Sequence, residues 1–278
     1  MRTKRRLSPI SIIIHIIMYA LALFWLYPYI WMVLASLKPT DKIMTTPFFQ
    51  GPFSFTNYSF LLHTSKTMNF SFLMALANSI FIAVVATVVV VISSAIVGYG
   101  LAKFEFKGKK FILGYIVFQM VFPSFMFIIP QFILMRNLHL INTYSGIILV
   151  YLMSAMWCYM CYQNFKSTPS EYIEAARIDG ATELWIVFRL MMPLNRTIMS
   201  IIAIFTFAGV WNDFLWPMVV MQNYGKMPLA VLLSNFNMQY GVYLGPVMAG
   251  SVILALPIVI GFIILRKYFL EGWAVSLK

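Results

Sequence analysis

The chain has 278 residues, of which 62% are hydrophobic and 10% are charged, and its mean hydropathy is +0.85. This composition excludes a soluble domain with a single anchor and predicts an all-α polytopic membrane protein. The net charge of +12 would suggest a nucleic-acid partner if the protein were soluble. In a membrane protein an excess of Lys and Arg mostly records orientation, so we expect no nucleic-acid partner.

Six apolar runs are long enough to cross a lipid bilayer as helices. The first, at residues 10–35, follows a basic N-terminal tail at residues 1–9. This run is longer than the apolar part of a signal peptide and lacks a convincing cleavage pattern, so we expect an uncleaved span, kinked at Pro28. The other five spans are predicted at residues 71–101, 111–135, 144–165, 197–221 and 246–265.

Polar segments connect these spans. Residues 36–70 and 223–245 are rich in turn-forming residues and are predicted to be external, the first with little regular structure beyond short turns. Residues 71–268 form the predicted transmembrane core, and residues 269–278 form a C-terminal tail. With the N-terminus inside, fifteen Lys and Arg residues fall on the inner side and five on the outer side. This asymmetry agrees with the positive-inside rule and predicts that both termini are cytoplasmic.

A charged segment at residues 167–196 separates the fourth and fifth spans. Thr168 and Glu171 have the spacing of a capping box, which predicts a helix capped at Thr168, and Gly180 should end this helix. Thr182 should begin a second helix that continues to the next proline. Two helices joined at a glycine are also the outline of a DNA-binding helix-turn-helix. The apolar runs on both sides exclude that alternative and place the segment in a loop between membrane helices.

Within this segment, Glu174-Ala175-Ala176 is followed by Gly180 and then by Pro193. The spacing resembles the EAA loop of ABC importer permeases of the carbohydrate-uptake, maltose-type family, with two conservative apolar replacements before the proline. The resemblance implies a type I ABC importer transmembrane domain with six transmembrane helices, in which this loop is a coupling helix that docks on a separate ATPase. It assigns that coupling role to Glu174, Ala175, Ala176, Arg177, Asp179, Gly180 and Pro193.

Four other stretches resemble the same family, namely residues 55–58, Asn78-Ser79, residues 211–214 and residues 248–251. The resemblance implies a permease subunit of an ATP-driven, binding-protein-dependent importer for a sugar or oligosaccharide in the plasma (inner) membrane. It also implies the partners of such a subunit. These are a second homologous permease subunit, two ATPase subunits and an external solute-binding protein.

The basic segment at residues 107–110 superficially resembles a phosphate-binding loop, but it lacks the first glycine of that motif and the Ser or Thr after the lysine. We therefore expect no cofactor on this chain, with ATP and magnesium bound by the partner ATPase subunits. No stretch combines a nucleophile, a base and an orienting residue, so an enzyme is not expected. Cys158 and Cys161 form a lone CxxC in an apolar run, which favours packing over metal or redox chemistry.

Asp213 is the acidic residue that falls inside a predicted span. A carboxylate in an apolar membrane helix costs about 3 kcal/mol, so Asp213 and its neighbours Asn212 and Trp211 are candidates for a pathway or gate. In the alternative interpretation, Asp213 hydrogen-bonds backbone or another subunit at the helix break before Pro217. A proton- or ion-coupled secondary transporter is the alternative function, but such proteins usually place several ionisable groups inside the membrane.

Overall fold

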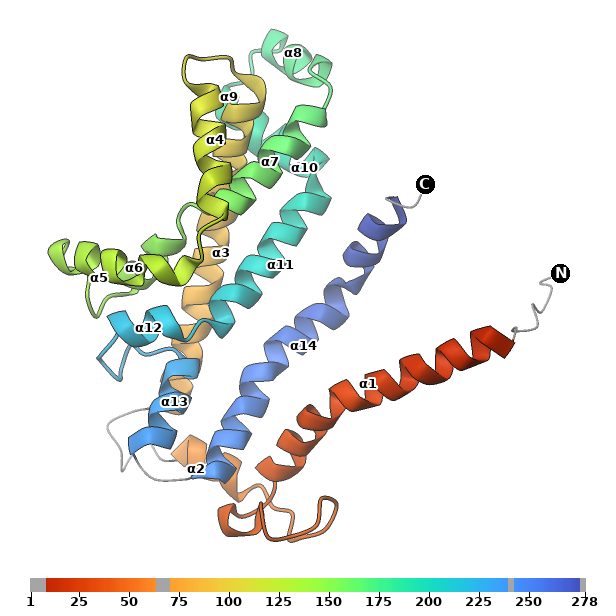
Figure 1. Ribbon diagram of the computed structural model, residues 1–278. Coiled ribbons are helices and arrows are strands. Elements are labelled where there is room, and N and C mark those ends of the chain that lie inside the picture. Colours follow the sequence, from red (N-terminus) through yellow and green to blue (C-terminus); the bar gives the residue numbers. More distant parts are fainter. Residues whose placement is uncertain (1–8, 64–70, 240–242, 276–278) are drawn as a thin grey trace. The chain divides into compact units, whose positions relative to one another are not determined.

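The computed structural model describes residues 9–63, 71–239 and 243–275, and every regular element among them is a helix (Figure 1). The chain divides into two compact units. Unit 1 comprises Met1–Thr64 and Asn235–Ala255, and unit 2 comprises Ser65–Ser234 and Leu256–Lys278. Most of the predicted N-terminal tail, the end of the predicted loop at residues 36–70 and the last three residues of the C-terminal tail lie outside the described residues.

Three single helices are long and apolar enough to cross a membrane, and the number rises to six if each of three bent helix pairs counts as one span. The single helices are α1 (Pro9–Ser36), α3 (Phe72–Lys103) and the described apolar part of α14 (Leu244–Val275). The all-α polytopic class is therefore confirmed. Helix α1 contains Pro28 and exposes apolar side chains along its length, as a lipid-facing span requires.

Unit 1 includes a short helical turn, η1 (Thr40–Lys42), and helix α2 (Thr56–His63) in the segment where we expected only short turns. The expectation was wrong because two buried polar side chains organise this segment. Asn57 donates through Nδ2 to the carbonyl oxygens of Ser36 and Lys38, both at 2.8 Å. The Nζ of Lys38 donates to the carbonyl oxygens of Pro47 at 2.8 Å and Phe48 at 3.2 Å. Buried polar groups with such partners hold a loop in one conformation.

Unit 2 is built around α3, which packs along α7 (Ala155–Ser167) and α11 (Arg196–Asn212). Ser71 caps the start of α3 by accepting a hydrogen bond from the backbone N–H of Met74. Gly98 allows the close approach of α7, because a Cβ at this position would lie 2.9 Å from the backbone carbonyl carbon of Cys161. Both cysteines of the CxxC motif are free and buried against α3. Small residues therefore determine this helix contact.

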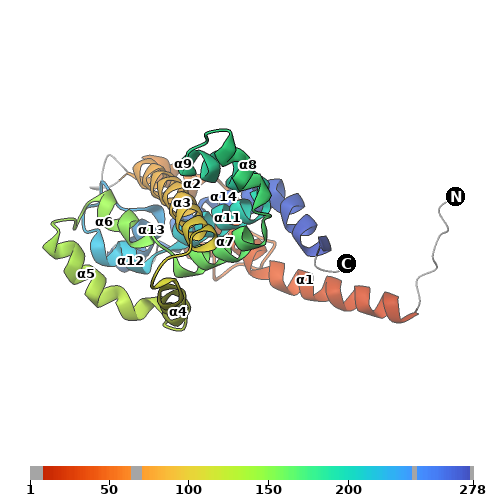
Figure 2. The same ribbon diagram turned by 90° about the horizontal axis from the view of Figure 1, so that it is seen from above.

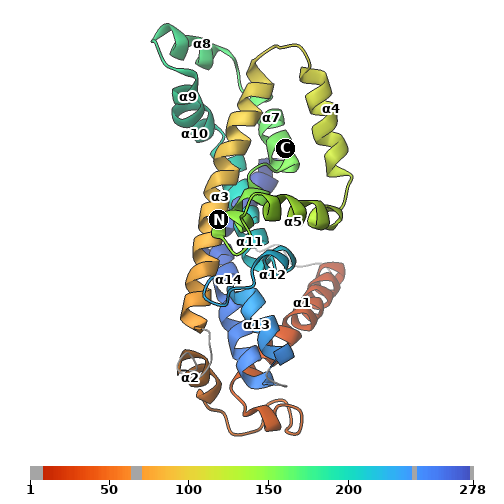
Figure 3. The same ribbon diagram turned by 90° about the vertical axis from the view of Figure 1, so that its left-hand side faces the viewer.

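The third and fourth predicted spans are broken helices. The third consists of α4 (Lys109–Met120), η3 (Ser124–Phe127) and α5 (Ile128–Asn137), with a bend of 103° that is visible in Figure 3. The fourth consists of α6 (Tyr144–Ile148), η4 (Leu149–Tyr151) and α7, with a bend of 44°. The fifth ends earlier than predicted, because the chain breaks at residues 213–214 before α12 (Leu215–Val220).

Helix α13 (Leu229–Gln239) lies in the second segment that we predicted to be external, where we expected no helix in particular. Its start is fixed by the Asn78-Ser79 pair of α3. Ser79 accepts a hydrogen bond from the backbone N–H of Leu229 at 2.7 Å, and Asn78 donates to the carbonyl oxygens of Gly225 at 3.1 Å and Met227 at 3.0 Å. Contacts between residues this far apart in the sequence explain why the local composition did not reveal the helix.

Candidate functional site

The segment at residues 167–196 folds into a compact loop at one end of unit 2, beside the ends of α3 and α7 (Figure 1). Its elements are α8 (Glu171–Ile178), α9 (Glu183–Trp185), the π-helical segment η5 (Ile186–Met191) and α10 (Met192–Leu194). Gly180 follows α8 with a φ of +80°, a left-handed conformation that favours glycine. Thr182 caps α9 by accepting from the backbone N–H of Trp185 at 3.3 Å. These two predicted signals are confirmed.

The predicted capping box at Thr168 is wrong. The backbone N–H of Thr168 donates to the carbonyl oxygen of Phe165, so this residue closes α7. Its hydroxyl bonds Asn164 and Asn195 and not a backbone N–H of α8. Helix α8 begins at Glu171 after Ser170, which provides no side-chain cap. The loop therefore starts with an uncapped turn.

The prediction that the second helix ends at Pro193 is also wrong. Pro193 lies inside α10, and the helix ends one residue later at Leu194. A proline in the first turn of a helical segment lacks only an N–H that is not needed there. Here α10 begins directly after the π-helical segment, so Pro193 lies in its first turn. The chain then bends by 89° at Asn195 into α11.

The loop presents one face to the core and another to the outside. Ile173, Ile186 and Met191 are buried in the same cluster as Tyr99 of α3, and Ala176 is half-buried against that cluster. The outer face carries exposed residues of two kinds. The acidic and small ones are Glu174, Ala175 and Asp179, and the large apolar ones are Tyr172, Ile178, Leu184 and Trp185. Ile178 is 86% exposed, and apolar side chains exposed on a folded loop indicate a contact surface.

An ion pair joins the two arms of this loop. The guanidinium of Arg177 donates from Nε to Oε1 of Glu183 at 2.8 Å and from Nη2 to Oε2 at 3.2 Å. These hydrogen bonds hold the pKa of Glu183 below its ordinary value and raise the pKa of Arg177. The pair is therefore ionised at neutral pH, and its contribution to stability is lost only as the pH falls through the lowered pKa of Glu183.

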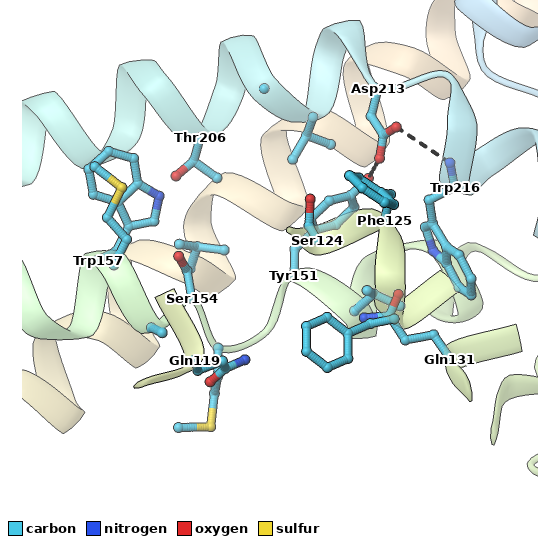
Figure 4. A pocket seen from close by; sticks show the side chains of 18 of the residues that line it. Gln119, Ser124, Phe125, Gln131, Tyr151, Ser154, Trp157, Thr206, Asp213 and Trp216 are labelled. Carbon is cyan, nitrogen blue, oxygen red and sulfur yellow. Dashed lines mark hydrogen bonds between the residues drawn. The ribbon is translucent and has the colours of Figure 1, made fainter. Parts of the chain in front are cut away.

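A cavity of about 550 Å³ lies in unit 2 where three spans are interrupted (Figure 4). Phe122, Ser154 and Asp213 line it from the breaks in the third, fourth and fifth spans. Irregular backbone at membrane depth is tolerated where it lines such a cavity. Its other lining groups include aromatic rings and uncharged polar side chains, among them Gln119, Gln131, Tyr151, Trp157, Thr206 and Trp216.

Asp213 occupies the break between α11 and α12. Its Oδ1 accepts from the backbone N–H groups of Leu215 at 3.1 Å and Trp216 at 3.4 Å, and its Oδ2 accepts from the hydroxyl of Tyr151 (Figure 4). The hydrogen bonds agree with the interpretation in which Asp213 stabilises a helix break. Its position in the wall of the cavity agrees with the interpretation in which it lines the pathway. A gating role for Asp213 stays a prediction.

The two neighbours of Asp213 do not line this cavity. Asn212 is exposed, and its side-chain amide donates to the carbonyl oxygen of Ala208 at 2.9 Å. Trp211 is 2% exposed and stacks on Phe207, with ring centroids 5.7 Å apart. Among the three residues that we singled out as a pathway or gate, the structure brings only Asp213 to the cavity.

The sequence did not direct attention to Thr206, which lines the same cavity from α11. Thr206 is 6% exposed, and its Oγ1 has no hydrogen-bond partner among the described residues. Figure 4 shows it on the same side of α11 as Asp213. The two residues are two helical turns apart, so helical periodicity could have placed them together. Tyr151 carries no comparable signal, because a short 3₁₀ turn positions it.

The comparisons with known proteins agree with this architecture. Residues 94–268 match the family described as binding-protein-dependent transport system inner membrane component. The chain is 31% identical over 99% of its length to the arabinooligosaccharides transport system permease protein AraQ of Bacillus subtilis (strain 168), covering 98% of that protein. It is 29% identical to the lactose transport system permease protein LacG of Rhizobium radiobacter, with both chains fully covered.

One solved structure extends the comparison to the fold. The crystal structure of a bacterial ABC transporter involved in the import of the acidic polysaccharide alginate contains a chain that is 26% identical, with a TM-score of 0.79. The match covers 97% of this chain and 98% of the other. The chain therefore belongs to the family of binding-protein-dependent transport system inner membrane components, and it is a multi-pass permease subunit of an ABC importer with the type I transmembrane fold.

Proposed function

We propose that this permease carries a neutral sugar or oligosaccharide and that the cavity in unit 2 forms part of its path. The observation that carries the proposal is the buried hydroxyl of Thr206, which lines the cavity and has no partner among the described residues. A buried hydroxyl without a partner is costly, and a solute hydroxyl would satisfy it. The named solutes of the similar proteins, arabinooligosaccharides, lactose and alginate, support a carbohydrate.

The other lining groups support the same class of solute. Sugar rings have apolar C–H faces and hydroxyl edges, and a site for them combines aromatic rings with a few polar groups. Trp157 and Trp216 provide rings, and Gln119 and Gln131 provide amides. The carboxylate of Asp213 already accepts three hydrogen bonds from the chain itself, so it favours an uncharged solute over a cation.

The energy for transport comes, in this proposal, from separate subunits. The loop at residues 167–196 carries the exposed surface of Glu174, Asp179 and apolar side chains that would dock on an ATPase. The complete importer would contain a second homologous permease subunit, two ATPase subunits that bind ATP and magnesium, and an external solute-binding protein. The charge asymmetry of the sequence supports cytoplasmic termini in the plasma (inner) membrane.

Uptake by the complete importer in proteoliposomes would test the proposed solute. Radiolabelled neutral oligosaccharides and one uronic-acid oligosaccharide serve as the solutes. Thr206→Val keeps the shape of the side chain and removes the hydroxyl. Losing one hydrogen bond of about 0.5–1.5 kcal/mol should raise the half-saturation concentration for a neutral sugar roughly 2- to 10-fold.

Thr197→Val is the matched control, because Thr197 is an exposed threonine on the same helix. We expect it to transport like the unmodified protein. The proposal fails if the unmodified importer takes up none of the neutral sugars, or if Thr206→Val transports them with unchanged half-saturation.

A further inference from the structure

Glu183 lies at a junction between the loop and α3. It is the first residue of α9, and its carboxylate accepts hydrogen bonds from two different elements. Arg177, in the last turn of α8, donates to both carboxylate oxygens. Tyr99 of α3 donates its hydroxyl proton to Oε2 at 2.5 Å. A short bond to a charged acceptor is stronger than one between neutral groups.

Aromatic packing surrounds this junction. The guanidinium of Arg177 lies over the ring of Phe104, 5.8 Å from its centroid. The ring of Phe104 in turn meets the ring of Tyr99 edge to face, with centroids 5.7 Å apart. Just after α7, the carbonyl oxygen of Thr168 accepts from the Nζ of Lys103 at 2.6 Å. The end of α3, together with Phe104 that follows it, therefore contacts the beginning of the loop, α8 and α9.

The hydrogen bond between Tyr99 and Glu183 connects the loop to α3, a helix that is not adjacent to the loop in the sequence. The loop is continuous with α7 before it and with α11 after it, but α3 is far away in the sequence. Tyr99 and Glu183 are 84 positions apart. Helix α3 also reaches the cavity, because Val90 lines it. Viewed from above in Figure 2, α8 and α9 lie beside α3.

We propose that Tyr99 is a positioning residue for energy coupling, which holds the Arg177–Glu183 pair against α3 so that a displacement of the loop moves α3 with it. The inference rests on the proposed function, in which a partner ATPase displaces the loop. The cytoplasmic end of α3 follows, and the displacement reaches the wall of the cavity through that helix.

A purely structural role for the junction makes a different prediction. The side chains of Arg177 and Glu183 are 42% and 43% exposed, and exposed ion pairs contribute little to stability. Removal of the Tyr99 hydroxyl leaves its buried ring in place and should leave the protein folded. A structural residue would lower thermal stability and transport together, whereas a coupling residue would change how movement of the loop is transmitted.

Hydrogen–deuterium exchange of the complete importer separates these roles without requiring a solute. Peptides from residues 171–191 and 94–103 are compared in the nucleotide-free state and in a state trapped with ATP, magnesium and vanadate. In the unmodified importer we expect both peptides to change on trapping. In Tyr99→Phe we expect the loop peptide to change and the α3 peptide to lose at least half of its response.

Three further variants sharpen the test. Tyr115→Phe makes the same substitution at an exposed tyrosine of α4 and should behave like the unmodified protein. Glu183→Gln keeps an acceptor for Tyr99 and should retain most of the α3 response, whereas Glu183→Ala should lose it. Uptake per ATP hydrolysed should fall at least 3-fold in Tyr99→Phe, with an unchanged amount of bound ATPase.

The inference is overturned if the α3 peptide of Tyr99→Phe responds as in the unmodified importer. It is also overturned if neither peptide responds in the unmodified importer, or if thermal stability and ATPase binding fall in proportion to uptake. Failure of the proposed solute class is a separate result, because it appears as missing sugar uptake while the exchange response is still measured.

Discussion

The carboxylate of Asp213 caps the start of α12 and also lines the cavity. Its Oδ1 accepts from two backbone N–H groups at the start of α12, which would otherwise have no helical partner. Its Oδ2 accepts from Tyr151, which lines the cavity. Because different oxygens make these contacts, substitutions can separate the helix cap from the charge.

We expect Asp213→Leu to destabilise the permease and Asp213→Asn to preserve it. Leucine removes the cap, at a cost of about 1 kcal/mol, and removes the acceptor of the half-buried Tyr151 hydroxyl, at a further cost of about 0.5–1.5 kcal/mol. Asparagine keeps an oxygen for the cap. Thermal unfolding of the purified complex measures the difference.

Sugar uptake by Asp213→Asn then decides whether the charge itself gates the path. A gate requires uptake or basal ATP hydrolysis to change while the complex stays assembled. Unchanged uptake and hydrolysis in Asp213→Asn, together with lost assembly in Asp213→Leu, would show that Asp213 is structural.

Among the elements, the loop at residues 167–196 depends most on backbone conformation. The turn between α8 and α9 passes through Gly180 at a φ of +80°, and a Cβ there would meet no atom within 4 Å. A larger residue at this position is therefore opposed by backbone strain and not by a clash. The substitution should change the geometry of the exposed surface, because Ile173 and Ile186 hold the buried side of the loop in place.

Gly180→Val should abolish sugar uptake while the protein remains folded in the membrane. A left-handed conformation costs an ordinary residue roughly 1–2 kcal/mol, and more when the residue is β-branched, so the turn should shift and misplace the surface that we propose docks on the ATPase. Glu174→Lys should have the same effect by inverting a charge on that surface. Uptake and ATPase stimulation in the reconstituted importer are the measurements.

Gly180→Asn serves as the control, because asparagine tolerates the left-handed conformation better than other residues. It should retain most of the transport. Normal uptake and ATPase stimulation in both Gly180→Val and Glu174→Lys would mean that the loop is only a solvated connector.

An element could be predicted from the sequence when the residues that fix its start or end lie within it or next to it. The start of α3 at Ser71, the turn at Gly180 and the cap at Thr182 are encoded within a few residues and were predicted. Helix α13 was not, because Asn78 and Ser79 fix its start from another part of the chain. The alternative interpretation gave Asp213 its backbone bonds but placed the helix break before Pro217, whereas α11 ends at Asn212.

The cavity was the least predictable feature, because segments far apart in the sequence form it. Helical periodicity related Thr206 to Asp213, but no local pattern pointed to Tyr151. The family, by contrast, was evident from the spacing around Glu174, and the comparisons confirm it. Fold and family therefore followed from the sequence, while the lining of the cavity required the structure.

For the whole molecule, the absence of a phosphate-binding loop from the sequence has an enzymatic consequence. We expect the purified chain alone to hydrolyse no ATP, because its one candidate, Lys107–Lys110, lacks the residues that hold phosphate and magnesium. A phosphate-release assay on a preparation free of other subunits makes this measurement. Specific hydrolysis by this preparation would contradict the assignment of energy supply to a partner.

The close contact of α3 and α7 at Gly98 has a practical consequence for spectroscopy. The two cysteines of the chain, Cys158 and Cys161, are enclosed in that contact and are 2% and 0% exposed. Water-soluble maleimides need an accessible thiolate, so they should leave both native thiols unmodified. A cysteine introduced on the outer face of the loop, for example at Ile178, would then be the only site that takes a fluorophore or spin label, without any need for a cysteine-free background.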